Sequence, residues 1–198
     1  FGRAGRCGNL RISCNSNLSF FAGKFPSIAF LSVFFLVFAN GTSANDGFHS
    51  LFIKDNGSLW GMGRNEYGQL GVGNTNQQNL PVQIIGAGVK QVASSWADSL
   101  FLKENGSLWG MGQNQTGLLG IGNTNQQNSP VQVLSSGVTQ IAVGNDCSLF
   151  LKEDGSLWGM GWNKYGMLGL GSANTLQFET PVQILPSGVA QVVAGIQH

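Results

Sequence analysis

The chain has 198 residues, 30 of them glycine, and its ten basic and nine acidic side chains give a formal charge of +1. All nine acidic residues lie at or beyond Asp46, where only six basic residues occur, so this part carries a formal charge of −3. It has no basic stripe that could neutralise phosphates, which excludes nucleic acid as an expected partner.

Residues 1–45 have the composition of a leader. They contain four basic and no acidic residues, an apolar run at residues 28–39, and then the small residues Thr42, Ser43 and Ala44. The apolar run is shorter than the roughly 20 residues that a membrane-spanning helix needs. The pattern predicts a signal peptide cut after about Ala44, a secreted or cell-surface protein, and no membrane span after cleavage. The alternative is a buried strand or helix of the folded domain.

The rest of the chain repeats itself. The heptapeptide Gly-Ser-Leu-Trp-Gly-Met-Gly occurs three times with a constant step of 49 residues. A fixed period of this length predicts stacked structural repeats, which usually present a surface and rarely hold a single reaction centre. We place the folded part at residues 46–198 and the three repeats at about residues 48–96, 97–145 and 146–198.

Each period contains four short β-branched or aromatic runs and no helical spacing. In the second period these runs are residues 130–134, 138–143, 148–152 and 156–160, and Asp154-Gly155 forms a hairpin turn between the last two. Four-stranded antiparallel sheets repeated at a fixed step are the blades of a β-propeller. The sequence therefore predicts an all-β chain of four-stranded propeller blades.

Both faces of the predicted strands are apolar, which favours stacking of one sheet on the next. Leu100 and Phe101 point to opposite faces because side chains alternate along a strand, and Trp109 and Met111 share the face opposite Leu108. An isolated sheet would leave one face in water and alternate apolar with polar residues. We expect neighbouring blades to bury both faces.

Cys147 is the single cysteine outside the leader, since Cys7 and Cys14 precede residue 45. Other copies have His49, Asp98 and His198 in its place. A position that accepts such different chemistry predicts a packed thiol in preference to a nucleophile. The same four residues could suggest a metal ring, but radially arranged blades would hold them too far apart.

No motif of a catalytic site is present in the repeats. The run that begins at Gly61 starts like a dinucleotide-binding fingerprint but lacks the third glycine and the helix that should follow. We expect no catalytic, cofactor-binding or metal-binding residue, and hence no enzyme.

The residues after each Met-Gly differ between copies, apart from one asparagine that we expect to brace the loop (Asn65, Asn114 and Asn163). Large amphipathic side chains of the kind that anchor interfaces occur among the varied residues. The candidate partner-binding residues are Arg64, Glu66, Tyr67, Gln113, Gln115, Trp162, Lys164 and Tyr165. The alternative is solvent-exposed loop decoration.

The repeated pattern Gly-Ser-Leu-Trp-Gly-Met-Gly-x-Asn-x-x-Gly-x-Leu-Gly-x-Gly, at residues 57–73, 106–122 and 155–171, resembles the repeat of the regulator of chromosome condensation family. One departure is that methionine (Met62, Met111, Met160) stands where many relatives have a second tryptophan, and methionine can fill that packing site. The resemblance implies a propeller of about seven blades. This chain would supply about three, and the remaining blades would come from the rest of a longer protein or from association.

The resemblance also implies that loops on one rim recognise a protein. The version with Leu-Trp before the glycine is similar to repeats in large exported bacterial proteins. We therefore expect a non-catalytic protein-binding or surface-display module, without a cofactor. Two alternatives stay open: a carbohydrate-binding propeller, because aromatic rings also stack on sugars, and a regulator of a small GTPase that acts as a guanine-nucleotide exchange factor, as the family's eukaryotic founder does.

Overall fold

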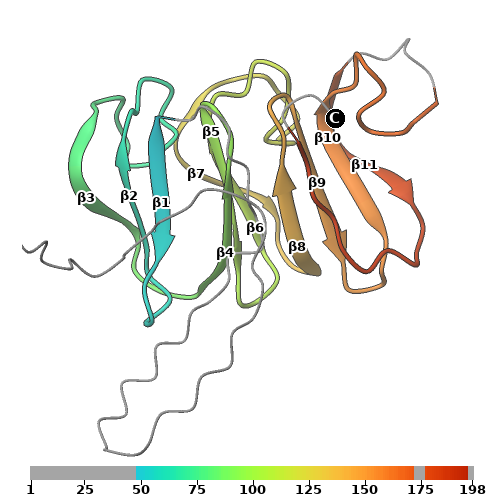
Figure 1. The fold of residues 1–198 in the computed structure, drawn as a ribbon, viewed down its shortest axis with the longest axis horizontal. Helices are drawn as coiled ribbons and strands as arrows, with labels where there is room; N and C mark the ends of the chain where they lie inside the picture. Colours follow the sequence, from blue (N-terminus) through green and yellow to red (C-terminus); the bar gives the residue numbers. More distant parts are fainter. Residues whose placement is uncertain (1–47, 172–176, 196–198) are drawn as a thin grey trace, which may run out of the picture. The chain divides into compact units, whose positions relative to one another are not determined.

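The computed structural model describes residues 48–171 and 177–195, which form eleven β-strands and no helix (Figure 1). Among these residues no helix could cross a lipid bilayer. The predicted leader, with its apolar run and its cleavage site, lies outside the described residues, as does His198. Within the described part, the expected all-β fold is confirmed.

The strands form three antiparallel sheets in chain order. The first holds β1 (His49–Ile53), β2 (Leu59–Gly63) and β3 (Gln78–Ile85); the second holds β4 (Val89–Ser94), β5 (Asp98–Lys103), β6 (Leu108–Gly112) and β7 (Gln127–Leu134); the third holds β8 (Val138–Val143), β9 (Cys147–Lys152), β10 (Leu157–Trp162) and β11 (Gln177–Leu185).

Two of the sheets have the four strands expected of a blade, and the first has three among the described residues. Its strands β1, β2 and β3 correspond to β5, β6 and β7 of the second sheet. A strand equivalent to β4 would come before Phe48, outside the described part. The sheet boundaries are offset from the sequence repeats, because the last strand within residues 48–96 is β4, which pairs in the second sheet.

The hairpin between the two middle strands fixes the register of each sheet. His49 pairs with Gly63 at one end of the first hairpin, and Ile53 pairs with Leu59 at the other. Gly57 in this turn has a φ of +73°, and a Cβ there would lie 2.9 Å from the backbone nitrogen of Gly88. Glycine is therefore required in the turn both by conformation and by space.

The register gives each sheet two distinct ends. We call the tight turns at residues 54–58, 103–107 and 152–156 the hairpin end, and residues 64–67, 113–116 and 162–165 the rim. In Figure 1 the hairpin end lies at the lower side of the sheets, and the rim loops lie at the upper side. The rim residues follow the strands that leave the hairpin end, so all three sets share one edge.

The second sheet buries one of its faces against the third sheet. Leu100, Leu102 and Leu108 cluster there with Ile141 and Phe150 of the third sheet, and all five side chains are fully buried. This face is a continuous apolar layer between two sheets.

The opposite face of the second sheet packs against the first. Phe101, Trp109 and Met111 cluster there with Leu59 and Ile84 of the first sheet. The predicted assignment of alternate residues to opposite faces is confirmed. Lateral stacking of the sheets supplies the burial that a single sheet lacks, as in a propeller.

Two glutamine side chains, one in β4 and one in β8, bond to the backbone of a neighbouring segment. Gln91 Nε2 donates to the carbonyl oxygen of Ile141 at 3.0 Å, and the Ile141 amide donates to Gln91 Oε1 at 3.2 Å. Gln140 holds the backbone of Val192 in the same way, at 3.1 and 3.2 Å. Gln91 therefore joins β4 to β8 of the next sheet, and Gln140 joins β8 to the segment that follows β11. The described residues form an incomplete β-propeller.

Candidate functional site

The rim loops are held from below by the repeated asparagine. Asn65 Nδ2 donates to the carbonyl oxygens of Asn74 and Asn76 at 2.8 and 3.1 Å, and its Oδ1 accepts from the Leu70 amide at 2.9 Å. Asn114 makes the corresponding three bonds at 2.7, 3.2 and 3.0 Å. The predicted bracing role is confirmed for these two loops, and the loop backbone is therefore fixed before its varied side chains are considered.

In the third loop, Asn163 Oδ1 accepts from the Leu168 amide at 3.0 Å. The carbonyl groups that would match the other two bonds belong to residues 172 and 174, which lie outside the described residues. The hydrogen bond from a leucine amide to the asparagine Oδ1 is therefore present in all three loops.

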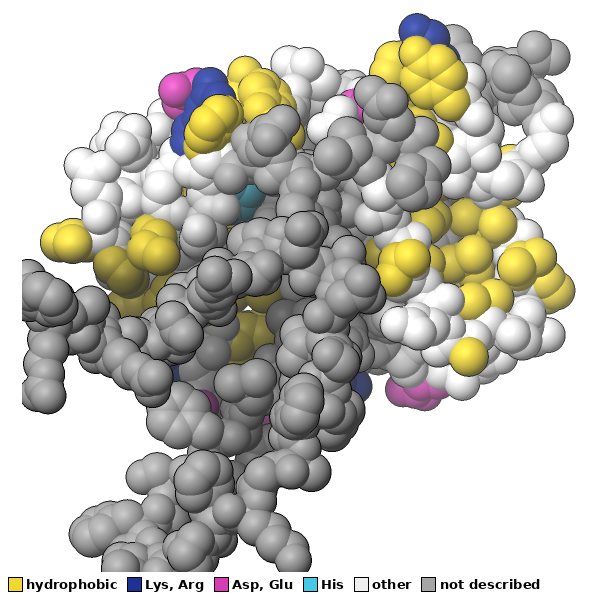
Figure 2. All heavy atoms as spheres, viewed as in Figure 1, with side chains coloured by type: hydrophobic (Ala, Val, Ile, Leu, Met, Phe, Trp, Pro, Cys, Tyr) yellow, Lys and Arg dark blue, Asp and Glu magenta, His cyan; other side chains and the backbone are white. Residues whose placement is uncertain are grey.

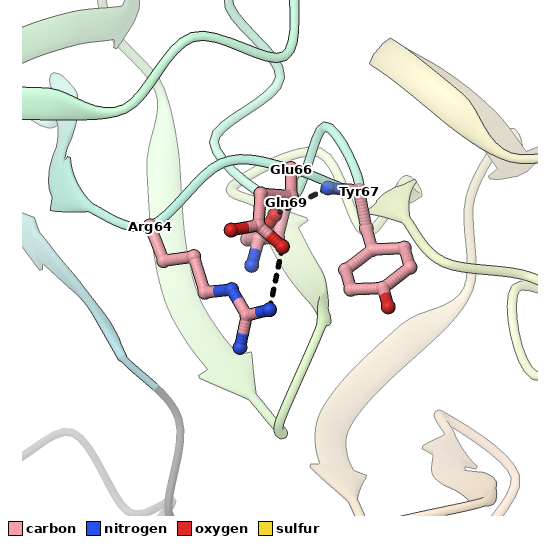
Figure 3. Close-up of polar contacts among 4 residues, drawn as sticks. All are labelled: Arg64, Glu66, Tyr67 and Gln69. Atoms are coloured by element: carbon pink, nitrogen blue, oxygen red, sulfur yellow. Dashed lines mark hydrogen bonds and ion pairs between the residues drawn. The ribbon is translucent and has the colours of Figure 1, made fainter.

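The first rim loop carries an ion pair. Arg64 Nη2 lies 2.5 Å from Glu66 Oε2, and this bond holds the pKa of Arg64 above its ordinary value (Figure 3). Next to it the Tyr67 amide donates to Gln69 Oε1 at 3.0 Å, which holds the loop backbone at the tyrosine. The positive charge of this loop is neutralised within the loop.

Two aromatic residues that the sequence analysis did not select also belong to this cluster. The Arg64 guanidinium carbon lies 5.4 Å from the ring centroid of Trp96, 5.6 Å from that of Phe48 and 5.9 Å from that of Tyr67. The rings of Tyr67 and Trp96 are 5.4 Å apart. Trp96 lies in the connection from β4 to β5, and its one signal in the sequence is that the next repeat has Asn145 in its place.

The second rim loop is uncharged. Gln113 Nε2 donates to Gln115 Oε1 at 3.3 Å, and Thr116 occupies the place of Tyr67. The two amides therefore satisfy each other where the first loop has its ion pair.

The third rim loop carries a cation on aromatic rings. Lys164 Nζ lies 5.0 Å from the ring centroid of Trp162 and 5.4 Å from that of Tyr165. The two rings meet edge to face at 6.3 Å, and Tyr165 is 70% exposed. Figure 2 shows basic side chains against hydrophobic ones at two places along the upper edge of the view, with acidic atoms beside one of them.

Beneath the rim lie the residues that vary at the start of β1, β5 and β9. Ser99 Oγ donates to the carbonyl oxygen of Gln69 at 2.9 Å, so its contact with His49 Nε2 at 3.0 Å requires the imidazole to donate. Burial lowers the pKa of His49 to about 4. The imidazole is therefore neutral at physiological pH and links the first sheet to the second.

Asp98 and Cys147 occupy the same place in the next two sheets. Burial raises the pKa of Asp98 to about 7, although Ser95 Oγ donates a hydrogen bond to its carboxyl group. Burial also raises the pKa of the Cys147 thiol to about 11, which keeps it protonated and supports the packed-thiol interpretation. In the described part of the chain no group of three His, Cys, Asp or Glu side chains could hold a metal ion.

A cavity of about 840 Å³ is lined by residues of β1, β4, β8 and β9 and of the hairpin end, and not by the rim. Its lining includes Lys90, Gln91 and Thr139, but none of the eight predicted partner-binding residues. The eight residues therefore lie outside this cavity, on loops at the opposite end of the sheets from the hairpin turns.

Comparison with protein families finds the regulator of chromosome condensation (RCC1) repeat at residues 56–102, 105–151 and 154–198, and a second model of this repeat at residues 138–166. A comparison with curated protein sequences found no match.

Among solved structures, human WBSCR16 matches with 30% identity and a TM-score of 0.59 over 68% of this chain and 36% of its own. Prp20p from Saccharomyces cerevisiae matches with 20% identity and a TM-score of 0.65, over 75% of this chain and 40% of its own. The structure of Kap60 bound to yeast RCC1 (Prp20) matches with 21% identity and a TM-score of 0.61, over 75% of this chain and 38% of the other. This chain therefore spans two fifths or less of these solved chains. Because the family model matches more than half of the chain, the chain belongs to the regulator of chromosome condensation (RCC1) repeat family.

Proposed function

We propose that this propeller segment is a non-catalytic module that binds a protein through its rim. The observation that carries the proposal is the contrast within each rim loop. One buried asparagine fixes the loop backbone, whereas the neighbouring side chains form an ion pair in one loop, an amide pair in the next and a cation on aromatic rings in the third. A fixed backbone with varied aromatic and charged side chains is typical of protein-recognition surfaces.

The comparisons support protein recognition at a general level. The structure of Prp20p is described together with its binding to Gsp1p and histones, and yeast RCC1 was solved bound to Kap60. Those partners belong to those proteins. What this chain shares with them is the fold, and the rim residues described above would set its own partner.

We also propose that the protein is exported, as a variant of the bacterial surface-display type. The support is the composition of residues 1–45, in which a basic segment, a short apolar run and small residues follow one another. Amino-terminal sequencing of the secreted protein should find a start near residue 45. Retention of the full chain inside the cell would contradict export but would leave the binding proposal intact.

Site-specific photo-crosslinking tests the binding proposal. A photoreactive phenylalanine analogue at Tyr165 places the probe on the rim, and the same analogue at Glu104, which is exposed at the hairpin end, is the matched control. We expect the rim probe to capture a defined protein from the native surroundings and Trp162→Ala to abolish that capture. Equal capture from both ends, or capture that ignores Trp162→Ala, would contradict the proposal.

A carbohydrate ligand is the second candidate, because Tyr165 presents an open ring beside Trp162. Aromatic faces in this arrangement could stack on sugar rings. Glycan-array binding that is lost in Trp162→Ala, without crosslinking of a protein at the rim, would favour this function over the first.

A further inference from the structure

Equivalent positions of the three rim loops differ in whether their charge is already neutralised. Positions 64 and 66 form the Arg64–Glu66 ion pair, and positions 113 and 115 are two amides bonded to each other. At positions 162 and 164 the tryptophan ring meets the ammonium group of Lys164, which has no carboxylate within ion-pair distance among the described residues. The third loop thus presents a full positive charge, whereas the first two do not.

The rings support Lys164 but leave its charge accessible. Its Nζ lies 5.0 Å and 5.4 Å from the centroids of Trp162 and Tyr165, within the range of cation–π attraction. The Trp162 amide donates to the carbonyl oxygen of Asp146 at 2.7 Å, which fixes the base of the cluster. Lys164 and Tyr165 are both exposed. A side chain restrained in this way loses less entropy when a partner pairs with it.

We propose that the Lys164 cluster (Trp162, Lys164 and Tyr165) binds an acidic peptide segment of the partner protein, with a carboxylate on the ammonium group and an adjacent apolar side chain on the Tyr165 ring. This inference rests on the proposed protein-binding function and specifies its chemistry. A lysine acts as a point charge that a single carboxylate can meet, without the bidentate geometry that an arginine fork imposes.

The net charge of the chain indicates that binding of an acidic segment at Lys164 acts only at short range. The part beyond residue 45 carries a formal charge of −3, so the field of the whole molecule does not attract an acidic segment from a distance. Recognition then depends on the short-range pairing at Lys164 and on burial of the aromatic rings. The binding affinity should accordingly depend on salt only weakly compared with that of a basic surface.

Peptide display on the full chain tests the proposal. A library of random twelve-residue peptides is selected for binding, and each clone is measured again against Tyr165→Ala and Lys164→Gln. The matched control is Lys103→Gln, because Lys103 also lies over a tryptophan, with its Nζ 4.7 Å from the ring centroid of Trp109, but at the hairpin end. Circular dichroism checks that each variant is folded.

We expect the clones that depend on Tyr165 to be enriched in Asp and Glu. Their affinity should fall about tenfold in Lys164→Gln, as for loss of a charged hydrogen bond, and should be unchanged in Lys103→Gln. Lys164→Arg should restore most of the affinity. Replacement of one acidic residue of the peptide by its amide should cost the same factor with the parent chain and nothing further with Lys164→Gln.

Two results would overturn the inference in different ways. Clones that need Tyr165 but lack acidic residues and ignore Lys164→Gln would refute acidic recognition and leave the protein-binding rim standing. A selection in which no clone depends on Tyr165 would refute the Lys164 cluster as a peptide-binding site, whereas the proposed function would fail only if the crosslinking experiment also captured no protein at the rim.

Discussion

The hairpin end and the rim of the same sheets follow opposite rules. At the hairpin end every sheet builds one relay, in which a tryptophan Nε1 donates to a serine Oγ at 2.8–2.9 Å and that serine donates to an Asn or Asp Oδ1 at 2.5–2.7 Å. A lysine Nζ lies 3.6–4.7 Å from the centroid of the same tryptophan ring. At the rim, by contrast, each sheet pairs its side chains through a different kind of interaction.

The difference separates the side chains that build the fold from those that can vary. The relay closes a tight turn, so its loss would leave buried polar groups without partners. The asparagine of each rim loop holds the loop backbone, so the exposed side chains of the loop are not needed to stabilise it. Interactions that recur in all three sheets therefore indicate a structural role, whereas the varied side chains of the rim can determine which partner binds.

The largest expected effect concerns a varied residue that is buried. The pKa of Asp98 is raised to about 7 by burial and by the negative charge of Asp146, against the hydrogen bond from Ser95, whereas its ordinary value is 3.8. A raised pKa in the folded state gives stability that is complete below pH 4 and is lost as the pH rises through 7. Asp98→Asn should therefore raise the free energy of unfolding at pH 8 by up to about 4 kcal/mol, at about 1.4 kcal/mol per pKa unit, with little change at pH 4.

Urea unfolding at pH 4, 6 and 8 measures this effect, and His49 supplies a control of opposite sign. Its lowered pKa, about 4 in place of 6.5, gives stability that is present above pH 6.5 and lost as the pH falls through 4. His49→Gln should remove that loss. An Asp98→Asn variant with the pH profile of the parent chain would show that the buried carboxyl group does not titrate as described.

The next effect should come from the brace of a rim loop. Asn114→Ala removes three hydrogen bonds under the second loop, and we expect it to lower the free energy of unfolding by about 3 kcal/mol. Gln113→Ala in the same loop should change it by less than about 0.5 kcal/mol. Chemical denaturation of the two variants gives the comparison directly. Equal losses would mean that the fixed and varied positions of the rim are not energetically distinct.

A smaller effect is expected at the hairpin end. Ser107→Ala breaks the relay between Asn105 and Trp109 at a side chain that is 1% exposed, and it should cost about 1–2 kcal/mol. The change should also appear in the tryptophan fluorescence, because the Trp109 Nε1–H loses its acceptor. Ser129→Ala, at an exposed serine of β7, is the control. A Ser107→Ala variant as stable as this control would contradict a structural role for the relay.

The smallest effect on stability should belong to the rim aromatic residues. Tyr165→Ala removes a ring that is 70% exposed, so the free energy of unfolding should change by less than about 0.5 kcal/mol. The same variant should lose partner binding in the crosslinking and peptide experiments. A loss of stability as large as that of Asn114→Ala would assign Tyr165 to the fold and remove it from the recognition surface.

Much of the fold could be predicted because its causes are local. Glycine in the turns, alternation along the strands and the 49-residue step identified the hairpins, the faces of Phe101 and Leu108, and the stacking of sheets. The asparagine brace was also predictable, since its bonds stay within one loop. The composition of the first rim cluster was not, because Phe48 and Trp96 reach Arg64 from other connections of the chain.

The sequence by itself determined that the chain is a row of antiparallel sheets with one constant end and one varied end, because period, turn chemistry and strand alternation act over a few residues. Tertiary structure decided which varied residues meet, which charge is left without a partner and which varied residue is buried. It also decided that the Gln91 side chain bonds to the backbone of Ile141, 50 residues further along the chain. These contacts join residues of different strands and sheets, and only the lateral packing of the sheets fixes their distances.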